Sequence, residues 1–292
     1  MITVLIFYLS GRGRHIRRLY ISDLDGTLLD SNGRVSDFTA ESINILIGKG
    51  MDFSFATARS VYSAMKITEK ISLKIPCILM NGVSVYDPVK KVYIKNEYIP
   101  QETARRIIDI FGKNGVRCFL YKIHDDILTA YFTELDSRVM TDFAESRNKE
   151  YKKPFVRCES LREVADGETV YINSTGGYEK LLPIKRAVEL IEEADCAFYE
   201  DTYTGEWFLE IFSHNASKAN GIKFLRMNYG FDEVVCFGDN LNDLPMFAES
   251  DIKIAVGNAK SELLRTADFI TLSNNENGVA EWLNKNYNSK IN

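Results

Sequence analysis

Short apolar runs alternate with longer amphipathic stretches along the first 80 residues. This pattern predicts strands at 19–22, 53–56 and 77–80, with helices at 38–49 and 61–70 between them. Strands that alternate with helices favour a parallel sheet joined by right-handed crossovers. Ligands of such a sheet bind at the carboxyl ends of its strands, and we expect the functional residues there.

The middle of the chain has a different rhythm, in which extended segments follow one another and helices lie between groups of them. This pattern indicates an antiparallel sheet. The predicted strands are 83–86, 92–95, 117–122, 127–133, 169–173, 197–203 and 207–212, and the predicted helices are 100–113, 136–147 and 178–193.

Alternation of helices and strands returns after residue 213. The predicted helices are 217–228, 244–248 and 261–267, and the predicted strands are 234–237, 252–256 and 269–271. We therefore expect an α/β fold, with a doubly wound parallel-sheet core formed by residues 1–95 and 213–292. An α+β domain of residues 96–212 is inserted between its halves, and residues 1–17 are expected to be an extension.

Composition narrows the class of function. The net charge of −5 gives no general attraction to nucleic acid, so no nucleic-acid partner is expected. The apolar segment 1–10 is too short to span a bilayer and lacks the basic start of a signal peptide, so no membrane partner is expected either. Five scattered cysteines indicate reduced thiols and a cytoplasmic protein. Three histidines in separate segments disfavour a histidine zinc site or a Ser-His-Asp triad.

Two carboxylates, Asp23 and Asp25, directly follow the first predicted strand. Residues i and i+2 of an extended chain face the same side, so the two acids are expected to point together. Like charges at short range repel, unless a cation offsets the repulsion or one carboxyl stays protonated. The alternative is a polar turn, which Asp-Gly pairs often mark.

Asp239 and Asp243 follow the predicted strand 234–237 and bring two more acids to the same edge of the sheet. An oxygen-rich pocket of this kind suits Mg²⁺, which usually takes one or two carboxylates together with water and phosphate. A capped helix N-terminus is the alternative, and it accounts for one of these acids but not for all.

Two other segments offer groups that bind anions. Thr57, Ala58 and Arg59 provide a hydroxyl, free N–H groups and a guanidinium at the start of a predicted helix, although a threonine there is most often a cap. Lys218 opens the helix that follows the insertion, where a cation opposes the helix dipole. We expect it to pair with an anion or with the acids, the alternative being a solvated surface lysine.

In this order the motifs resemble those of the haloacid dehalogenase (HAD) superfamily: Asp-Leu-Asp-Gly-Thr at 23–27, Thr57, Lys218, and Gly-Asp-x-x-Asn-Asp at 238–243. The long insertion resembles the C2-type (IIB) cap of its Cof-like sugar-phosphatase branch. The resemblance implies a Rossmann-like HAD core with an inserted α+β cap. Ala58 is a departure, because many relatives have glycine there.

The resemblance also implies a Mg²⁺-dependent phosphatase for small phosphorylated metabolites, with sugar phosphates as the expected substrates. Asp23 would be the nucleophile that forms an aspartyl-phosphate, and Asp25 the general acid and base, kept protonated by a neighbouring carboxylate and partial burial. Mg²⁺ would be held by Asp23, the Asp25 backbone carbonyl and Asp239, with Asp243 in support. The residues expected to hold the phosphoryl group or the substrate are Leu24, Thr57, Ala58, Arg59, Lys218 and Asn242.

Two other functions remain open on the sequence. A phosphosugar mutase of the same superfamily uses the same aspartyl-phosphate to transfer rather than to hydrolyse, and activation by a bisphosphorylated sugar would favour it. A catalytically inactive binding or regulatory module would keep the fold alone. The only partner expected besides substrate is the chain itself, as a monomer or small homo-oligomer.

Overall fold

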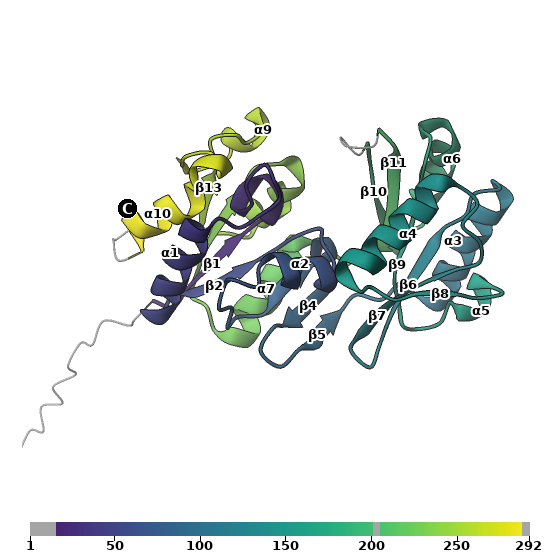
Figure 1. Ribbon diagram of the computed structural model, residues 1–292, viewed down its shortest axis with the longest axis horizontal. Helices are drawn as coiled ribbons and strands as arrows, with labels where there is room; N and C mark the ends of the chain where they lie inside the picture. Colours follow the sequence, from purple (N-terminus) through teal and green to yellow (C-terminus); the bar gives the residue numbers. More distant parts are fainter. Residues whose placement is uncertain (1–15, 201–204, 288–292) are drawn as a thin grey trace, which may run out of the picture.

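A parallel sheet is the scaffold of the computed structural model, which describes residues 16–200 and 205–287 (Figure 1). Within these ranges the sheet has five strands in the order β14-β13-β12-β1-β2, and each neighbouring pair is parallel. The strands are β1 (Arg18–Ser22), β2 (Asp52–Phe55), β12 (Glu233–Gly238), β13 (Ile252–Ala255) and β14 (Phe269–Ile270). The predicted doubly wound parallel sheet is confirmed.

Helices cover both faces of this sheet, because successive side chains of a strand point to opposite sides. Tyr20 of β1 belongs to the apolar cluster of α1 and α10, whereas Leu19 and Ile21 belong to that of α7, α8 and α9. The helices are α1 (Asp37–Gly48), α7 (Lys218–Tyr229), α8 (Leu244–Ala248), α9 (Ser261–Leu264) and α10 (Gly278–Asn286). The central strand β1 is therefore buried from both sides, and its carboxyl end is held firmly.

A second sheet, drawn at the right of Figure 1, has the strand order β10-β11-β9-β6-β7-β8 among the described residues. Its pairs are antiparallel, as predicted, except for the parallel pair of β7 and β8. Its strands are β6 (Phe119–His124), β7 (Ile127–Phe132), β8 (Phe155–Arg157), β9 (Thr169–Gly176), β10 (Ala194–Glu200) and β11 (Trp207–Ser213). The domain boundaries at 95/96 and 212/213 stay a prediction.

The second sheet also has helices on both faces. One face packs against α3, α5 and α6, and the other packs against α4. These helices are α3 (Gln101–Lys113), α4 (Arg138–Tyr151), α5 (Leu161–Val164) and α6 (Tyr178–Val188). In the described residues, none of the helices combines the length and the apolar character needed to cross a bilayer.

The third predicted strand of the core was only partly right. Strand β3 (Cys77–Leu79) touches the parallel sheet through a single parallel bridge between Ala56 and Ile78. It pairs instead with β4 (Ser84–Asp87) and β5 (Val92–Asn96) in a small antiparallel sheet. The chain reverses at Met80, Asn81 and Gly82, all with positive φ, so β3 cannot continue along the edge of the parallel sheet.

Several helix ends and three short elements differ from the prediction. Helix α2 (Val61–Ile67) ends before residue 70, because the Ile71 N–H donates to the Thr68 carbonyl instead of continuing the helical pattern. Helices α6 and α9 also end earlier than predicted, and β8, α5 and α10 were not predicted. The predicted extension and the end of the predicted strand 197–203 fall largely on residues 1–15 and 201–204, outside the described residues.

Gly82, in the turn after β3, packs closely against Ser217 at the start of α7. We expect Gly82→Ala to destabilise the protein. Its φ is +98°, and a Cβ there would lie 2.1 Å from the Ser217 carbonyl oxygen. Backbone strain and this contact together should lower the free energy of unfolding by roughly 2–4 kcal/mol. Urea unfolding measures the loss. Gly33→Ala is the matched control, because Gly33 also has positive φ but nothing lies within 4 Å of its added Cβ; equal losses in both variants would contradict the argument.

Candidate active site

Asp23 lies immediately after β1, at the carboxyl end of this inner strand. Its backbone N–H donates to the Phe237 carbonyl of β12 at 2.9 Å, which continues the parallel ladder by one residue. The residue is 5% exposed. The strand geometry therefore holds this carboxylate in a buried position at the edge where ligands of such sheets bind.

Asp25 has different surroundings from those of Asp23, and the expectation that the two carboxylates point together stays a prediction. The strand ends at Ser22, and Asp25 lies within the turn Leu24–Leu28, where Gly26 has a φ of +81°. Its carboxylate accepts two hydrogen bonds from Arg59, at 2.7 and 2.5 Å. The side chain is 53% exposed and is ion-paired with the Arg59 guanidinium.

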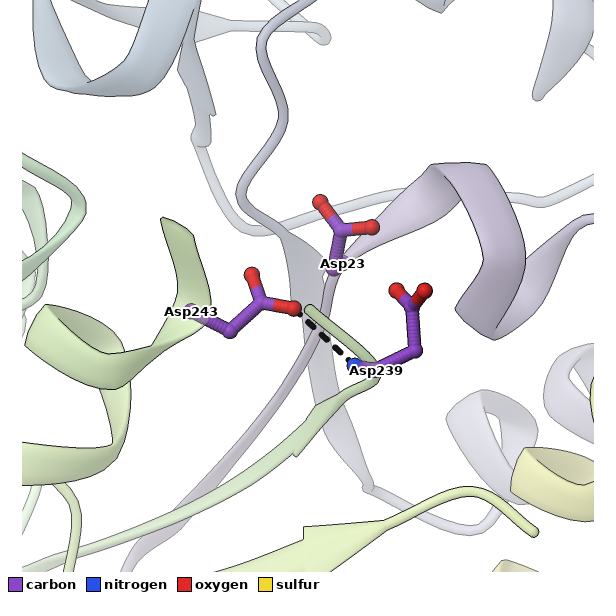
Figure 2. Close-up of side chains that lie close together, drawn as sticks. All are labelled: Asp23, Asp239 and Asp243. Carbon is purple, nitrogen blue, oxygen red and sulfur yellow. Dashed lines mark hydrogen bonds between the residues drawn. The ribbon is translucent and has the colours of Figure 1, made fainter. Parts of the chain in front are cut away.

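Three acids do gather at the ends of β1 and β12. Asp23, Asp239 and Asp243 each offer an oxygen within 4.8 Å of the others. Figure 2 shows the carboxylates of Asp23 and Asp239 side by side, with Asp243 turned toward the backbone of Asp239. Asp243 Oδ2 accepts the N–H groups of Asp239 at 3.0 Å and of Asn240 at 3.1 Å. The loop after β12 is thus folded around Asp243.

Lys218 is buried among these acids rather than on the surface. Its Nζ donates to Asp23 Oδ1 at 2.6 Å and to Asp243 Oδ1 at 2.7 Å, and the residue is 2% exposed. Ser217 caps α7 by accepting the Asn220 N–H at 3.0 Å, so the helix begins at Lys218 and projects it toward the sheet edge. One ammonium therefore bridges two of the three acids.

Burial and mutual repulsion perturb the ionisation of this cluster. Burial raises the pKa of Asp23 well above its ordinary value, although Lys218 opposes the shift. Burial also raises the pKa of Asp239 to about 6. Burial by itself lowers the pKa of Lys218, but its two carboxylate partners outweigh this and the net shift is upward. Three carboxylates share one ammonium, so the cluster holds an excess of negative charge.

The donor set of this cluster fits a hard divalent cation. Asp23 Oδ1 and both oxygens of Asp243 are engaged by Lys218 or by backbone N–H groups, and Asp239 Oδ1 accepts from the Thr27 hydroxyl at 2.8 Å. That leaves Asp23 Oδ2 and Asp239 Oδ2 as carboxylate donors. Two carboxylates, completed by water and a phosphate, are what Mg²⁺ usually accepts.

The segment after β2 lies beside Asp25 and has a free backbone donor. Thr57 is fully buried, and its hydroxyl accepts the Arg59 N–H at 3.1 Å. The Thr57 N–H is used by the Ile78 carbonyl at 3.0 Å. Within the described residues the Ala58 N–H donates to no protein acceptor, so it can meet a bound anion.

Two of the expected phosphate-binding residues are placed less directly. Leu24 has its side chain in the apolar core, so only its main chain can face a ligand. Asn242 is exposed in the short helix Leu241–Asp243, and within the described residues no hydrogen bond joins it to the acids.

Sequence reasoning missed several residues that support the site. Thr27 fixes Asp239, and Asn258 Nδ2 donates to the Gly26 carbonyl at 2.8 Å. Among the described residues, Asn81 Oδ1 is buried with no hydrogen-bond partner. Thr27 stands inside the first motif, and Asn81-Gly82 after a strand also resembles the Cof-like branch, so both could have been found from the sequence. Asn258 has no such signal.

A cavity of about 730 Å³ opens between this edge of the sheet and the second sheet. Asp25, Ala58 and Arg59 line it from the core, and residues of β6, β9 and β11 line it from the other side. The cavity therefore connects the acidic edge with a wall that the insertion provides.

Comparisons with known proteins agree with this arrangement. A family model described as haloacid dehalogenase-like hydrolase matches residues 20–283. Phosphatase YwpJ of Bacillus subtilis is 25% identical over 289 residues, covering 91% of this chain and 98% of YwpJ. The 5-amino-6-(5-phospho-D-ribitylamino)uracil phosphatase YwtE of the same organism is 27% identical, covering 90% of this chain and 96% of YwtE.

Solved structures are similar over nearly the same length. TM0651 from Thermotoga maritima has a TM-score of 0.77 at 28% identity, covering 92% of this chain and 97% of that one. A HAD subclass IIB sugar phosphatase, BT4131, has a TM-score of 0.66 at 20% identity and supports the fold alone. Because the family model covers most of the chain and the site has its acids, the protein belongs to the haloacid dehalogenase-like hydrolases, as a Cof-like phosphatase.

Proposed function

We propose that this phosphatase hydrolyses small phosphorylated metabolites, with sugar phosphates as the leading class, through an aspartyl-phosphate on Asp23 and with Mg²⁺ as cofactor. The observation that carries the proposal is the buried Asp23 at the end of β1, with one oxygen held by Lys218 and the other left beside Asp239. A carboxylate fixed in this way is positioned for in-line attack on phosphorus.

In the first step, one oxygen of the Asp23 carboxylate forms a bond to phosphorus and the ester oxygen leaves with its electron pair. Asp25 gives the leaving oxygen a proton, and it lines the cavity from which that oxygen departs. In the second step, water attacks phosphorus, Asp25 takes its proton, and the bond to Asp23 breaks. Asp25 must exchange its contact with Arg59 for each proton transfer, which its exposure permits.

Positive charge and N–H donors around Asp23 stabilise the transferring phosphoryl group. Lys218, the Thr57 hydroxyl and the Ala58 N–H are the candidates for this role, with Leu24, Arg59 and Asn242 as further ones. When bound, Mg²⁺ supplies charge that offsets the repulsion between the acids and an anionic substrate. Asp23 and Asp239 would hold it with the Asp25 carbonyl, while Asp243 orients the loop and Lys218.

The substrate class can be tested by phosphate release from a panel of compounds, with Mg²⁺ and with EDTA. The panel contains sugar phosphates, nucleotides, pyridoxal phosphate and the phosphoribityl compound that YwtE is named for. We expect release from at least one sugar phosphate with Mg²⁺ and a loss of at least a hundredfold with EDTA, an order of magnitude typical of a removed charge stabiliser.

Other results would count against parts of this proposal. Undiminished release in EDTA would contradict the metal, and release that requires a bisphosphorylated activator would favour the mutase.

The five cysteines are free thiols, which supports action in a reducing compartment such as the cytoplasm. A monomer or small homo-oligomer remains the expected state.

A further inference from the structure

Lys153 is a buried cation in the wall of the cavity that faces Asp25. It lies between α4 and β8 and is 8% exposed. Its ammonium sits 4.1 Å from the centre of the Tyr121 ring and lines the 730 Å³ cavity. Within the described residues no carboxylate lies within ion-pair distance of it. A buried ammonium without an anionic partner is costly, so it needs an explanation.

Neighbouring acids form no ion pair with it. The charge of Glu210 acts on Lys153, but its carboxylate accepts the Tyr199 hydroxyl at 2.9 Å and is also hydrogen-bonded to Tyr171. Arg147 of α4 lines the same cavity and stacks on the rings of Phe143 and Tyr151, with no acid paired to it among the described residues. Glu200 and Glu210 also line the cavity, but in the described residues neither is ion-paired with the two cations.

On the core side of the cavity, the charged side chains are already paired with each other. Arg59 is paired with Asp25, and the phosphoryl group is expected at Asp23 beyond them. Lys153 and Arg147 thus face the part of a substrate that lies on the leaving-group side of phosphorus. A group bound there is distinct from the phosphate that is cleaved.

We propose that Lys153, with Arg147 beside it, binds a second anionic group carried by the leaving group of the substrate, a carboxylate or a further phosphate. The inference rests on the proposed phosphatase function and names its substrate class: phosphorylated sugar acids and sugar bisphosphates are preferred over matched sugars with one phosphate. Charge-assisted hydrogen bonds from Lys and Arg to such groups are short and strong, which explains why a buried amine is retained here.

Two matched substrate pairs test this preference. The first is 6-phosphogluconate against glucose 6-phosphate, which adds a carboxylate, and the second is fructose 1,6-bisphosphate against fructose 6-phosphate, which adds a phosphate. The wild-type protein should favour the doubly anionic member of at least one pair by roughly ten- to a hundredfold in kcat/KM, as expected for hydrogen bonds to charged groups. Which pair responds identifies the anion.

Variants then assign the preference to Lys153. Lys153→Met should remove it and leave kcat/KM for the singly phosphorylated member within about threefold, because that substrate makes no use of the ammonium. Lys153→Arg should keep most of it. Lys149→Met is the matched control, because it removes the same charge from an exposed position of α4, four residues before Lys153.

Stability gives a readout that is independent of turnover. Burial lowers the pKa of Lys153 to about 7, with Arg147 of α4 adding to the shift and Glu210 of β11 opposing it. Other ionisable groups that line the same cavity wall are the Glu200 carboxylate of β10 and the hydroxyls of Tyr121 on β6, Tyr151 on α4, Tyr171 on β9 and Tyr199 on β10. Below pH 7 the folded state must bury the charged amine, whereas at pH 10.5 and above the amine is neutral in both states.

Lys153→Met should therefore raise Tm at pH 6 and below, and the gain should shrink as the pH rises toward 10. A lower Tm for Lys153→Met at every pH would make the lysine a structural residue and overturn the inference. So would equal use of both members of each pair by the wild-type protein, or an equal loss for both members in Lys153→Met. If no compound of the panel or the pairs is hydrolysed at all, the proposed phosphatase function fails, and this inference fails with it.

Discussion

Asp23→Asn is expected to abolish phosphate release, with a fall of roughly 10⁴-fold or more in kcat, the size seen when a catalytic nucleophile is removed. An amide oxygen is a poor nucleophile, and no other carboxylate can take its place. Asp243 is held by Lys218 and by backbone N–H groups, and Asp239 by Thr27. The measurement is steady-state release from the best compound of the panel at saturating Mg²⁺.

The loss should come without unfolding. Asp23 is one of three acids around a single ammonium, and burial already raises its pKa, so the ionised carboxylate costs stability at neutral pH. A neutral amide removes that cost, and Tm should stay equal or rise. Asp142→Asn, on an exposed acid of α4, is the control and should change neither quantity. Turnover by Asp23→Asn at a tenth of the wild-type rate or more would make the nucleophile assignment wrong.

The parallel core could be predicted because strands β1, β2 and β12 have four to six residues rich in apolar side chains, and helical patterns lie between them. Strands that are buried on both faces need apolar side chains on both sides, which makes them visible in the sequence. The elements that were missed carry weaker signals. Strand β8 has three residues and α5 has four, too few for a period to be visible.

The acids of the site were predictable for the same reason. Asp23 and Asp239 stand directly after apolar strands, and neighbouring parallel strands end at one edge of the sheet. The surroundings of Asp25 were not predictable from the strand pattern, since β1 ends at Ser22 and Asp25 lies in the turn Leu24–Leu28. Its turn depends on Gly26, where a Cβ would lie 2.5 Å from Asp239 Oδ2, a contact between residues far apart in sequence.

The two buried lysines differ in how far the sequence predicts them. Lys218 stands at the start of a predicted helix, where a cation opposes the helix dipole, and the expected pairing with the acids is confirmed. No such signal accompanies Lys153, which follows α4 in polar surroundings. Its burial in the cavity wall depends on tertiary packing alone.

Lys218→Met should lower both stability and turnover, and it is the variant for which the two effects most need to be separated. Removing the ammonium leaves the carboxylates of Asp23, Asp239 and Asp243 together without a positive charge. Breaking a buried ion pair in this way costs about 3–5 kcal/mol in the free energy of unfolding. Loss of a charge that stabilises the transferring phosphoryl group should also reduce kcat/KM by roughly 10²–10³-fold.

A second substitution distinguishes the catalytic role of Lys218 from a structural one. In the double variant Lys218→Met, Asp243→Asn, one of the stranded charges is removed, while the amide oxygen can still accept the N–H of Asp239 as Asp243 Oδ2 does. Much of the lost Tm should return, because the repulsion has been reduced. Turnover should not return, because no cation faces the phosphoryl oxygens from that side. Recovery of activity in step with Tm would show instead that Lys218 only holds the acids in place.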